Sequence, residues 1–456
     1  MVGMAMGTRK QRERQADLWI ATSDIVQTPG HVFYERLNAV LRAHRFDAKV
    51  EHLCRRFYRG QYGRPSLAPG VYFRLLLVGF FEGLDSERAI AWRLADSLSL
   101  RTFIGYGLDE PTPDHSTISR TRRLFWLSTH QAVFRWVLKV LAQADLLVGT
   151  TISVDATTLE ANAAMRSIVR RDSGQTYQAY VTGLAQAAGL EDLTREQLAR
   201  FDRKRTKTTS NRDWTHPHDP DARVTKMKDG RTHLAHKVEH GVDLATGALV
   251  AVTLQPADRG DTSTILPTLA AAQRVVEALS ETTVHEAVAD RGYHSGDLLE
   301  ALQAQQIRTY IAEPDRGRRH WAGKKVEQQQ VYANRRRLRG SRSKRLQRLR
   351  SELTERSFAH LYDTGGMRRV HLRGRDNILK RLLVHGAGFN LALLMRTRYG
   401  AGKPRQATAR LAALTALLAA LWRRCRPVLI VIRDYCRGAA RAPIMSGSYS
   451  ACAAVS

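Results

Sequence analysis

Three acidic residues stand where predicted strands and helices begin or end, and each could supply a carboxylate to a shared site. Asp155 lies in the β-branched run TTISVDATTLEA, Asp290 ends the apolar run VHEAVAD, and Glu355 lies on a predicted helix in LTERSFAHLYDTGGMRR. Taken singly, such residues usually cap a helix, bond a turn amide or lie on an exposed face. If they converge, three bare carboxylates repel one another, and a divalent cation such as Mg²⁺ relieves that repulsion.

The composition indicates what such a site would act on. Two metal ions about 4 Å apart can stabilise both the attacking and the leaving oxygen of an in-line displacement at phosphorus. The chain has 72 Lys+Arg against 43 Asp+Glu, a formal charge of +29. That excess predicts a polyanionic partner, for which we favour nucleic acid over an anionic membrane surface. Together these features suggest phosphodiester chemistry on DNA.

Several features predict a cytoplasmic, nucleoid-associated protein with no membrane partner. The first residues, MVGMAMGTRKQRERQADLWI, contain no apolar signal core, so we do not expect secretion. The apolar segment LAALTALLAALW, 411–422, is too short to span a bilayer and predicts a packed or interfacial helix. The scattered cysteines suit a reducing cytosol; they are Cys54, Cys425, Cys436 and Cys452.

Apolar residues at three- and four-residue spacing predict an all-α N-terminal domain over 31–147, after a flexible N-terminus, 1–30. The segment PTPDHSTISRTRRLF, 111–125, begins like a helix and presents Arg120, Arg122 and Arg123 within about one turn. It could be the basic helix of a helix-turn-helix variant that binds DNA. An ordinary bundle with a solvated basic face explains the same residues equally well.

Residues 148–396 predict an α/β catalytic domain with a mixed sheet. A first strand and a hairpin with its turn at Asp243–Gly247 precede alternating helices and strands, from TSTILPTLAAAQRVVEAL to IRTYIAE. Insertions are expected at about 160–232 and 316–345. In the first, Thr194 and Gln197 predict a capping box that starts the helix LTREQLARF. Residues 397–456 are expected to form a C-terminal helix and a mobile tail.

The stretch 316–350 is the most basic part of the chain, and it also contains Trp321 and Tyr332. A run of this kind is often only a solvated or disordered segment. Here it lies inside the chain, and aromatic side chains are available to stack on bases, so we favour a DNA-binding channel. The arginines assigned to it are Arg335, Arg336, Arg337 and Arg348.

Four segments resemble bacterial insertion-sequence transposases of the DDE type: SVDATTLEANA, VADRGYHS, ERSFAHLYDTGGMRRVHLRGRDNILKRLLVHGAGFNLALLMR and PTPDHSTISR. The resemblance runs from about residue 60 to 396. It implies an RNase H-like catalytic fold, a helical N-terminal domain that binds element ends, and dependence on two Mg²⁺ or Mn²⁺ ions. It assigns the two aspartates and the glutamate of the family to Asp155, Asp290 and Glu355.

The third carboxylate has a rival. In related groups a Tyr, an Arg, the Glu and a Lys follow one another at short fixed spacing, and here Arg348 lies four residues before Glu352. We prefer Glu355, because the family's Glu-Arg-Ser/Thr-Phe context matches it. Asp258 and Asp261 are interpreted as turn and N-cap residues without metal. A zinc site is not expected at the histidines of the first hairpin strand, which are His233, His236 and His240.

The implied reaction is cleavage at the element ends, followed by attack of the freed 3′-OH on target DNA. Both ends must be cut and joined together, so a homodimer on double-stranded DNA is expected. Arg291 would hold backbone phosphates, while Tyr293 and Trp321 would stack on or wedge distorted bases. The alternatives are a nuclease of the same fold that does not transfer strands and a non-catalytic DNA-binding remnant of a mobile element.

Overall fold

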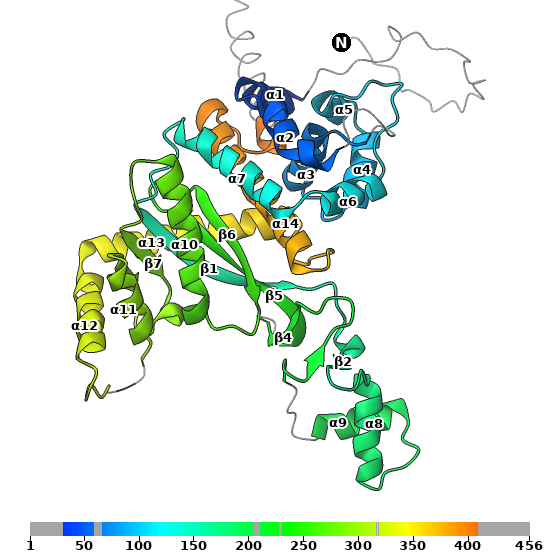
Figure 1. Cartoon of the computed structure of the whole chain (residues 1–456), viewed down its shortest axis with the longest axis vertical. Coiled ribbons are helices and arrows are strands. Elements are labelled where there is room, and N and C mark those ends of the chain that lie inside the picture. Colours follow the sequence, from blue (N-terminus) through cyan, green and yellow to red (C-terminus); the bar gives the residue numbers. More distant parts are fainter. Residues whose placement is uncertain are drawn as a thin grey trace, which may run out of the picture.

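Seven helices precede the first strand in the described part of the chain (Figure 1). The computed structural model describes residues 31–58, 66–204, 210–227, 230–315, 317 and 319–408. Gly83 and Gly105 end two of these helices with positive φ, which glycine adopts without steric cost. The helices are α1 (Val32–Ala43), α2 (Phe46–Cys54), α3 (Pro69–Glu82), α4 (Glu87–Ala95), α5 (Leu98–Ile104), α6 (His115–Leu124) and α7 (Leu127–Ala142).

The late helix α14 (Arg375–Tyr399) returns to this helical part and packs against both α3 and α7. Arg381 of α14 is only 1% exposed. Its guanidinium donates to the Leu84 carbonyl oxygen at 2.9 Å and to Nε2 of His385 at 2.8 Å. A buried cation needs such partners, and here they join the end of the chain's α/β part to the helical part.

The stretch Arg375–Thr408, which contains α14, is long and apolar enough to cross a membrane. However, 89% of its most apolar window is buried inside the protein, as expected for a core helix. The predicted N-terminus, 1–30, lies outside the described residues. So do the apolar segment 411–422 and most of the predicted C-terminal region, 397–456.

A mixed sheet forms the second part of the molecule, with β1 near its middle. On one side β1 pairs antiparallel with β5, which also pairs with β6 and β4, and on the other it pairs parallel with β7, which continues to β8. The predicted β5–β6 hairpin is confirmed. The strands are β1 (Thr151–Glu160), β4 (Arg223–Lys226), β5 (Thr232–Asp243), β6 (Leu249–Pro256), β7 (Glu286–Ala289) and β8 (Arg308–Ile311).

Helices α10 (Asp261–Leu279) and α13 (Ser341–Phe358) cover opposite faces of this sheet, while α11 (Gly296–Ala304) connects β7 to β8. Successive side chains of a strand point to opposite faces. On β5, Glu239 accepts hydrogen bonds from threonines of α10, whereas the next residue, His240, bonds Ser357 of α13. The sheet is therefore enclosed between helices, as expected for an α/β layer.

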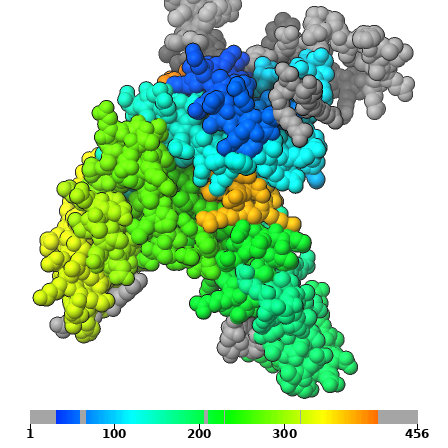
Figure 2. All heavy atoms as spheres, viewed as in Figure 1, coloured from blue at the N-terminus to red at the C-terminus, as the bar shows by residue number. Residues whose placement is uncertain are grey.

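Residues 161–204 and 210–222 lie between β1 and β4 in the chain and form a projection that Figure 2 shows extending from the sheet. Its elements are β2 (Val169–Arg170), α8 (Tyr177–Ala187), α9 (Arg195–Lys204) and β3 (Trp214–Thr215). Buried Trp214 and Ile168 belong to a small separate core. The predicted capping box of α9 is confirmed, since Thr194 and Gln197 each accept a hydrogen bond from the other's backbone N–H.

The most basic stretch of the chain, 316–350, packs against the α/β part of the protein. It forms α12 (Lys325–Arg339) and the first turns of α13, and α12 contacts α11 and β8. Asn334 of α12 is fully buried, and its amide bonds both the N–H and the carbonyl oxygen of Ile311. A polar side chain thus satisfies the backbone of β8, a contact that hydrophobic periodicity does not reveal.

Candidate active site

Asp155 lies in the middle of β1 with its carboxylate held from two directions. One oxygen, Oδ1, accepts the Ala156 N–H at 2.8 Å, and the other, Oδ2, accepts from Nη1 of Arg350 on α13 at 3.0 Å. Both side chains of this ion pair are less than a quarter exposed. The β-branched residues before Asp155 pair with β5 and β7, so the backbone position of this carboxylate is set by the sheet.

Asp290 follows β7 at the level of Asp155. The parallel register pairs Val288 with Ser153, and two further residues on each strand lead to Asp290 and Asp155. Asp290 caps the 3₁₀ turn η4 (Arg291–Tyr293), because its Oδ1 accepts the Gly292 N–H at 2.9 Å. The side chain therefore both caps a turn and stands beside Asp155. Within the described chain no cation pairs with Asp290, so its charge is available to a ligand.

The acidic groups at this place affect the pKa of Asp155. Burial is the main cause that raises the pKa of Asp155 to about 6 from its usual 3.8, and the negative charges of Asp290 and Asp261 raise it further. The Ala156 N–H and the Arg350 guanidinium lower it. The site therefore holds Asp155 in an environment that disfavours its bare charge, a condition that a bound cation would relieve.

Asp261, the first residue of α10, is a third carboxylate at this place. A Cβ added to Gly292 would stand 2.9 Å from Oδ2 of Asp261 and 3.1 Å from Oδ1 of Asp290. Any side chain at position 292 would therefore press on both carboxylates. The interpretation of Asp261 as an N-cap residue is wrong: Gly260 is the N-cap of α10, and Asp261 lies in the first turn beside the two aspartates.

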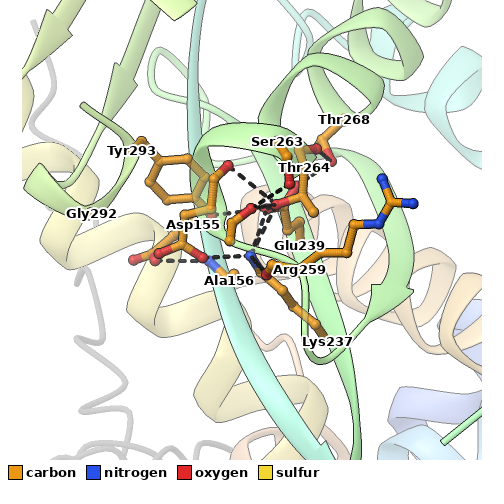
Figure 3. Close-up of polar contacts among 12 residues, drawn as sticks. Asp155, Ala156, Lys237, Glu239, Arg259, Ser263, Thr264, Thr268, Gly292 and Tyr293 are labelled. Atoms are coloured by element: carbon orange, nitrogen blue, oxygen red, sulfur yellow. Dashed lines mark hydrogen bonds and ion pairs between the residues drawn. The ribbon is translucent and has the colours of Figure 1, made fainter. Parts of the chain in front are cut away.

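A buried polar network supports the site on the α10 side of the sheet (Figure 3). Nζ of Lys237 donates to Oδ1 of Asp261 at 2.5 Å and to Oγ1 of Thr264 at 2.9 Å, and it lies 3.7 Å from Oε1 of Glu239. Tyr293 donates its hydroxyl to Glu239 at 3.1 Å. Burial, reinforced by Glu239, Asp261 and Asp155, raises the pKa of Tyr293 well above its usual value, so this hydroxyl keeps its proton.

The two candidate glutamates on α13 are less firmly placed. Ser153 of β1 and Thr354 of α13 share a hydrogen bond of 2.5 Å, which fixes the face that α13 presents to the sheet. At 3.6 residues per turn, Glu355 lies about 100° and Glu352 about 200° around the helix from Thr354. Both glutamates are exposed, and Glu352 pairs only with Arg356 of its own helix at 2.6 Å. Measured from the centre of the buried face of α13, which Ser343, Leu346, Thr354 and Ser357 form, Glu355 lies about 140° and Glu352 about 160° away, so both point away from the sheet.

Glu355 does not join the aspartates in this structure. The α13 side chain that reaches Asp155 is Arg350, and no hydrogen bond or ion pair within the described residues links Glu355 to Asp155 or Asp290. Across the same residues, no three acidic, histidine or cysteine side chains are grouped as metal ligands. The sheet therefore brings two predicted carboxylates together, and the third stands on the neighbouring helix.

The donor set at the sheet is nevertheless suited to a hard divalent cation. Asp155 and Asp290 offer carboxylate oxygens, the ligands that Mg²⁺ and Mn²⁺ favour. The histidines of β5 are engaged elsewhere: Nε2 of His236 lies 3.1 Å from Oδ2 of Asp219, and His240 bonds Ser357 and Tyr362. Burial lowers the pKa of His240 to about 3, so this ring is a neutral link between β5 and α13.

The arginines predicted to bind DNA fall into two groups. Arg122 is buried and paired with Glu87, Arg335 is paired with Glu313, and Arg337 donates to the Thr309 carbonyl oxygen. These three stabilise the fold. The other five are exposed and have no acidic partner among the described residues; they are Arg120, Arg123, Arg291, Arg336 and Arg348.

The aromatic residues predicted to contact bases are also occupied inside the protein. Tyr293 is 1% exposed and donates a hydrogen bond to Glu239, so it is part of the buried network and does not face a base. Trp321 packs against the core, with its ring 6.1 Å from that of Tyr332 and the Arg319 guanidinium 5.7 Å away. Tyr293 therefore has no exposed ring face of the kind that stacking requires, whereas Trp321 is only partly buried and its contact with a base stays a prediction.

Lys237, Glu239 and Arg350 had no assigned role in the sequence. The sequence pattern could have indicated Lys237 and Glu239, because they share one face of a strand whose other residues are mainly buried. Two opposite charges at that spacing inside a β-hairpin indicate a buried pair with further partners. Arg350 gave no such signal, since it is one of many arginines in its segment.

Two family models match the chain. A transposase domain (DUF772) matches residues 21–124, and a transposase DDE domain matches residues 168–391. The second match includes Asp290, Glu352 and Glu355 but begins after Asp155. Comparison with curated proteins gives no match. The two domains occur in the order expected of one family, and they cover the helical part and most of the sheet. The chain therefore belongs to the insertion-sequence transposases of the DDE type.

Proposed function

We propose that this transposase cuts DNA at the ends of its insertion sequence and joins the freed 3′-OH to target DNA. The observation that supports the proposal is the position of Asp155 and Asp290, each two residues beyond the last parallel pair of β1 and β7, with burial raising the pKa of Asp155. Glu355 is proposed as the third carboxylate, because its Glu-Arg-Ser-Phe context matches the family's Glu-Arg-Ser/Thr-Phe pattern. Such a reaction takes place on DNA in the cytoplasm.

We propose an RNase H-like core. The strand series β6, β5, β1, β7 and β8 supports this, since the first three strands pair antiparallel and the last two run parallel to β1. The carboxylates lie where β7 ends and leaves the following residues of β1 uncovered. Ligand sites in α/β sheets commonly lie at such carboxyl ends of strands.

Asp155, Asp290 and Glu355 would hold Mg²⁺ or Mn²⁺, in a site for two ions. When bound, the ions would lower the pKa of an attacking water and stabilise the charge that develops on the phosphate. The protein would contribute by holding these carboxylates in position. Ala156 and Gly292 orient the two aspartates through their N–H groups, while Lys237 donates a hydrogen bond to Asp261.

The exposed arginines would hold the DNA backbone around this site. Arg291 directly follows Asp290, Arg336 and Arg348 lie on α12 and α13, and Arg120 and Arg123 lie on α6. Positive side chains bind phosphates without reading sequence, with an affinity that falls steeply as salt rises. Cutting and joining two ends together requires two active sites, so a homodimer on DNA is part of the proposal.

A strand-transfer assay tests the proposal and separates it from the alternatives. The substrate is a duplex from the DNA that flanks the gene, with a pre-cut 3′-OH end, and the cation is Mg²⁺. Joined product that disappears in Asp155→Ala and Asp290→Ala supports transposition. Hydrolysis alone would indicate a nuclease of the same fold. If the parent protein cuts and joins no better than the two variants, the protein has no catalytic role of this kind.

A further inference from the structure

A positively charged groove lies at the boundary between the helical part and the sheet, away from the carboxylates. Its volume is about 760 Å³, and it is lined by α2, by α7 and by Leu279 at the end of α10. Four cationic side chains surround it: Arg45 and Lys49 on the α2 side, and Arg135 and Lys139 on α7. We refer to it as the α2–α7 groove.

The charges of the α2–α7 groove are not neutralised by the protein. All four cations are exposed, and none forms an ion pair or a side-chain hydrogen bond with another described residue. No aspartate or glutamate lines the groove. Elsewhere in the described chain many arginines have carboxylate partners, as in the pairs Arg74–Asp47 and Arg122–Glu87. The four positive charges around the α2–α7 groove repel one another, and a bound anionic ligand would offset this repulsion.

The spacing of the cations suits an extended polyanion better than a small anion. On α7, Arg135 and Lys139 are four residues apart, so they are neighbours on one helix face, about 5–6 Å apart at Cβ. Arg45, just before α2, and Lys49 on α2 line the other side of the groove. The groove thus offers two short rows of charge. Its apolar side includes Trp136, which is half-buried against Phe46 with ring centroids 5.0 Å apart. Part of the groove wall is therefore packed against the core.

Backbone strain is present at one of these cations. Arg45 has φ 53° and ψ 45°, the left-handed region, which costs a non-glycine residue roughly 1–2 kcal/mol. A glycine or asparagine would be favoured in this tight connection between α1 and α2. Strain that persists at a residue with an exposed, unpaired cation is a reason to look for a ligand there.

We propose that the α2–α7 groove binds the sugar–phosphate backbone of the same DNA duplex whose end lies at the carboxylates. This inference rests on the proposed function, to which it adds a second DNA contact. Helix α10 gives the spacing, because it begins at Asp261 beside the carboxylates and ends at Leu279 in the groove. Its 19 residues span about 27 Å at 1.5 Å per residue, which corresponds to about eight base pairs of duplex at 3.4 Å each.

The test is the salt dependence of DNA binding by a triple variant, Lys49→Gln, Arg135→Gln and Lys139→Gln. Arg45 stays unchanged because of its backbone conformation. The matched control exchanges the same residues as Lys49→Arg, Arg135→Lys and Lys139→Arg, which keeps the charges. The probe is a fluorescent 30-base-pair duplex from the DNA flanking the gene, with anisotropy measured between 50 and 200 mM salt. Both variants are first checked for the parent's melting temperature.

Each lost phosphate contact reduces the slope of log K against log salt by about 0.9. The Gln variant is expected to show a slope about 2 to 3 less negative than that of the parent, and the control an unchanged slope. An unchanged slope in the Gln variant, while the parent binds normally, overturns the groove proposal and leaves the proposed function intact. A parent protein that fails to bind any of this DNA overturns both.

A photo-crosslinking residue at position 139 tests the shared duplex. With a pre-cut end bound, crosslinks are expected at nucleotides about eight base pairs or more from that end. Crosslinks confined to the end itself, or none at all in a protein that binds the probe, would show that the groove holds something else.

Discussion

The two aspartates on the sheet and the two glutamates on α13 are the same kind of group in different settings. Asp155 and Asp290 each accept a hydrogen bond from a backbone N–H, and the register of β1 and β7 sets their separation. Glu355 has no hydrogen bond or ion pair with any other described side chain, and Glu352 pairs only along its own helix. The sheet preorganises two carboxylates, whereas the proposed third carboxylate lies on an exposed face of a helix.

This difference bears on how such a site is assembled. Preorganised groups lose little free energy of ordering when a ligand binds. A flexible glutamate must be ordered by the ligand, which makes it a weaker part of the site in the absence of DNA or metal. Arg350 currently occupies one oxygen of Asp155, so the α13 side of the site is held by a cation and not by an acid.

The largest effect is expected at the preorganised pair. Asp155→Asn or Asp290→Asn should reduce the rate of DNA cleavage roughly 10³-fold, because metal stabilisation is worth several kcal/mol and each 1.36 kcal/mol is a factor of ten. Cleavage of a labelled duplex in Mg²⁺ measures this rate. Asp258→Asn is the matched control, since that carboxylate lies only in a loose pair with Arg223 at 3.8 Å. Comparable rates in all three variants would contradict the assignment.

The glutamates provide the next test. Glu355→Gln is expected to slow cleavage about 10²-fold, less than the aspartate changes because this side chain must first be ordered. Glu352→Gln should stay within about twofold of the parent, because its only partner is Arg356 on the exposed side of α13. The same cleavage assay measures both. If the two variants exchange these effects, Glu352 is the third carboxylate.

The sequence could predict the sheet half of the site because local signals agree there. The β-branched run around Asp155, the apolar run before Asp290 and the hairpin turn each favour the strands that form. The sequence patterns for the part of the site on α13 were weaker. The sheet-facing positions of α13 include Ser343, Thr354 and Ser357, which are buried small polar residues, so apolar spacing did not separate the two glutamates.

Contacts between distant segments could not be predicted in the same way. Arg122 stands among exposed arginines in the sequence, yet the packing of α6 against α4 places it on Glu87. Lys237 and Asp261 are joined only after the hairpin brings β5 to the start of α10. Such pairs depend on tertiary arrangement, which single-residue patterns do not encode.

The buried polar network of Lys237, Glu239 and Asp261 beside the aspartates should contribute to the stability of the fold. Lys237→Met leaves Glu239 buried without its cation, and breaking a buried pair from one side costs about 3–5 kcal/mol. We expect about 3 kcal/mol here, the low end, because Asp261 is 38% exposed. Urea denaturation measures the free energy of unfolding. Lys324→Met removes a surface cation that is 62% exposed and should cost no more than about 0.5 kcal/mol. Equal losses in the two variants would contradict a structural role for the network.

The smallest expected effect concerns the charge of Asp155 in the metal-free protein. Its pKa is raised from 3.8 to about 6 in the folded state, mainly by burial. Between about pH 4 and pH 6 the folded state therefore binds more protons than the unfolded chain, and stability from this group falls as pH rises through that window. Asp155→Asn should remove a loss of about 2 kcal/mol, seen as a difference between parent and variant unfolding curves in EDTA.

A change at Arg350 tests whether this pH effect comes from the Asp155–Arg350 ion pair. Its guanidinium lowers the pKa of Asp155, so Arg350→Gln should raise that pKa and extend the fall in stability to higher pH. Urea denaturation of the metal-free proteins at half-unit steps from pH 4 to pH 8 measures both variants. Parallel curves for the parent and Asp155→Asn across the whole range would show that Asp155 ionises freely. The sheet would then position this carboxylate without disfavouring its charge, and the contrast with the exposed glutamates would be one of geometry alone.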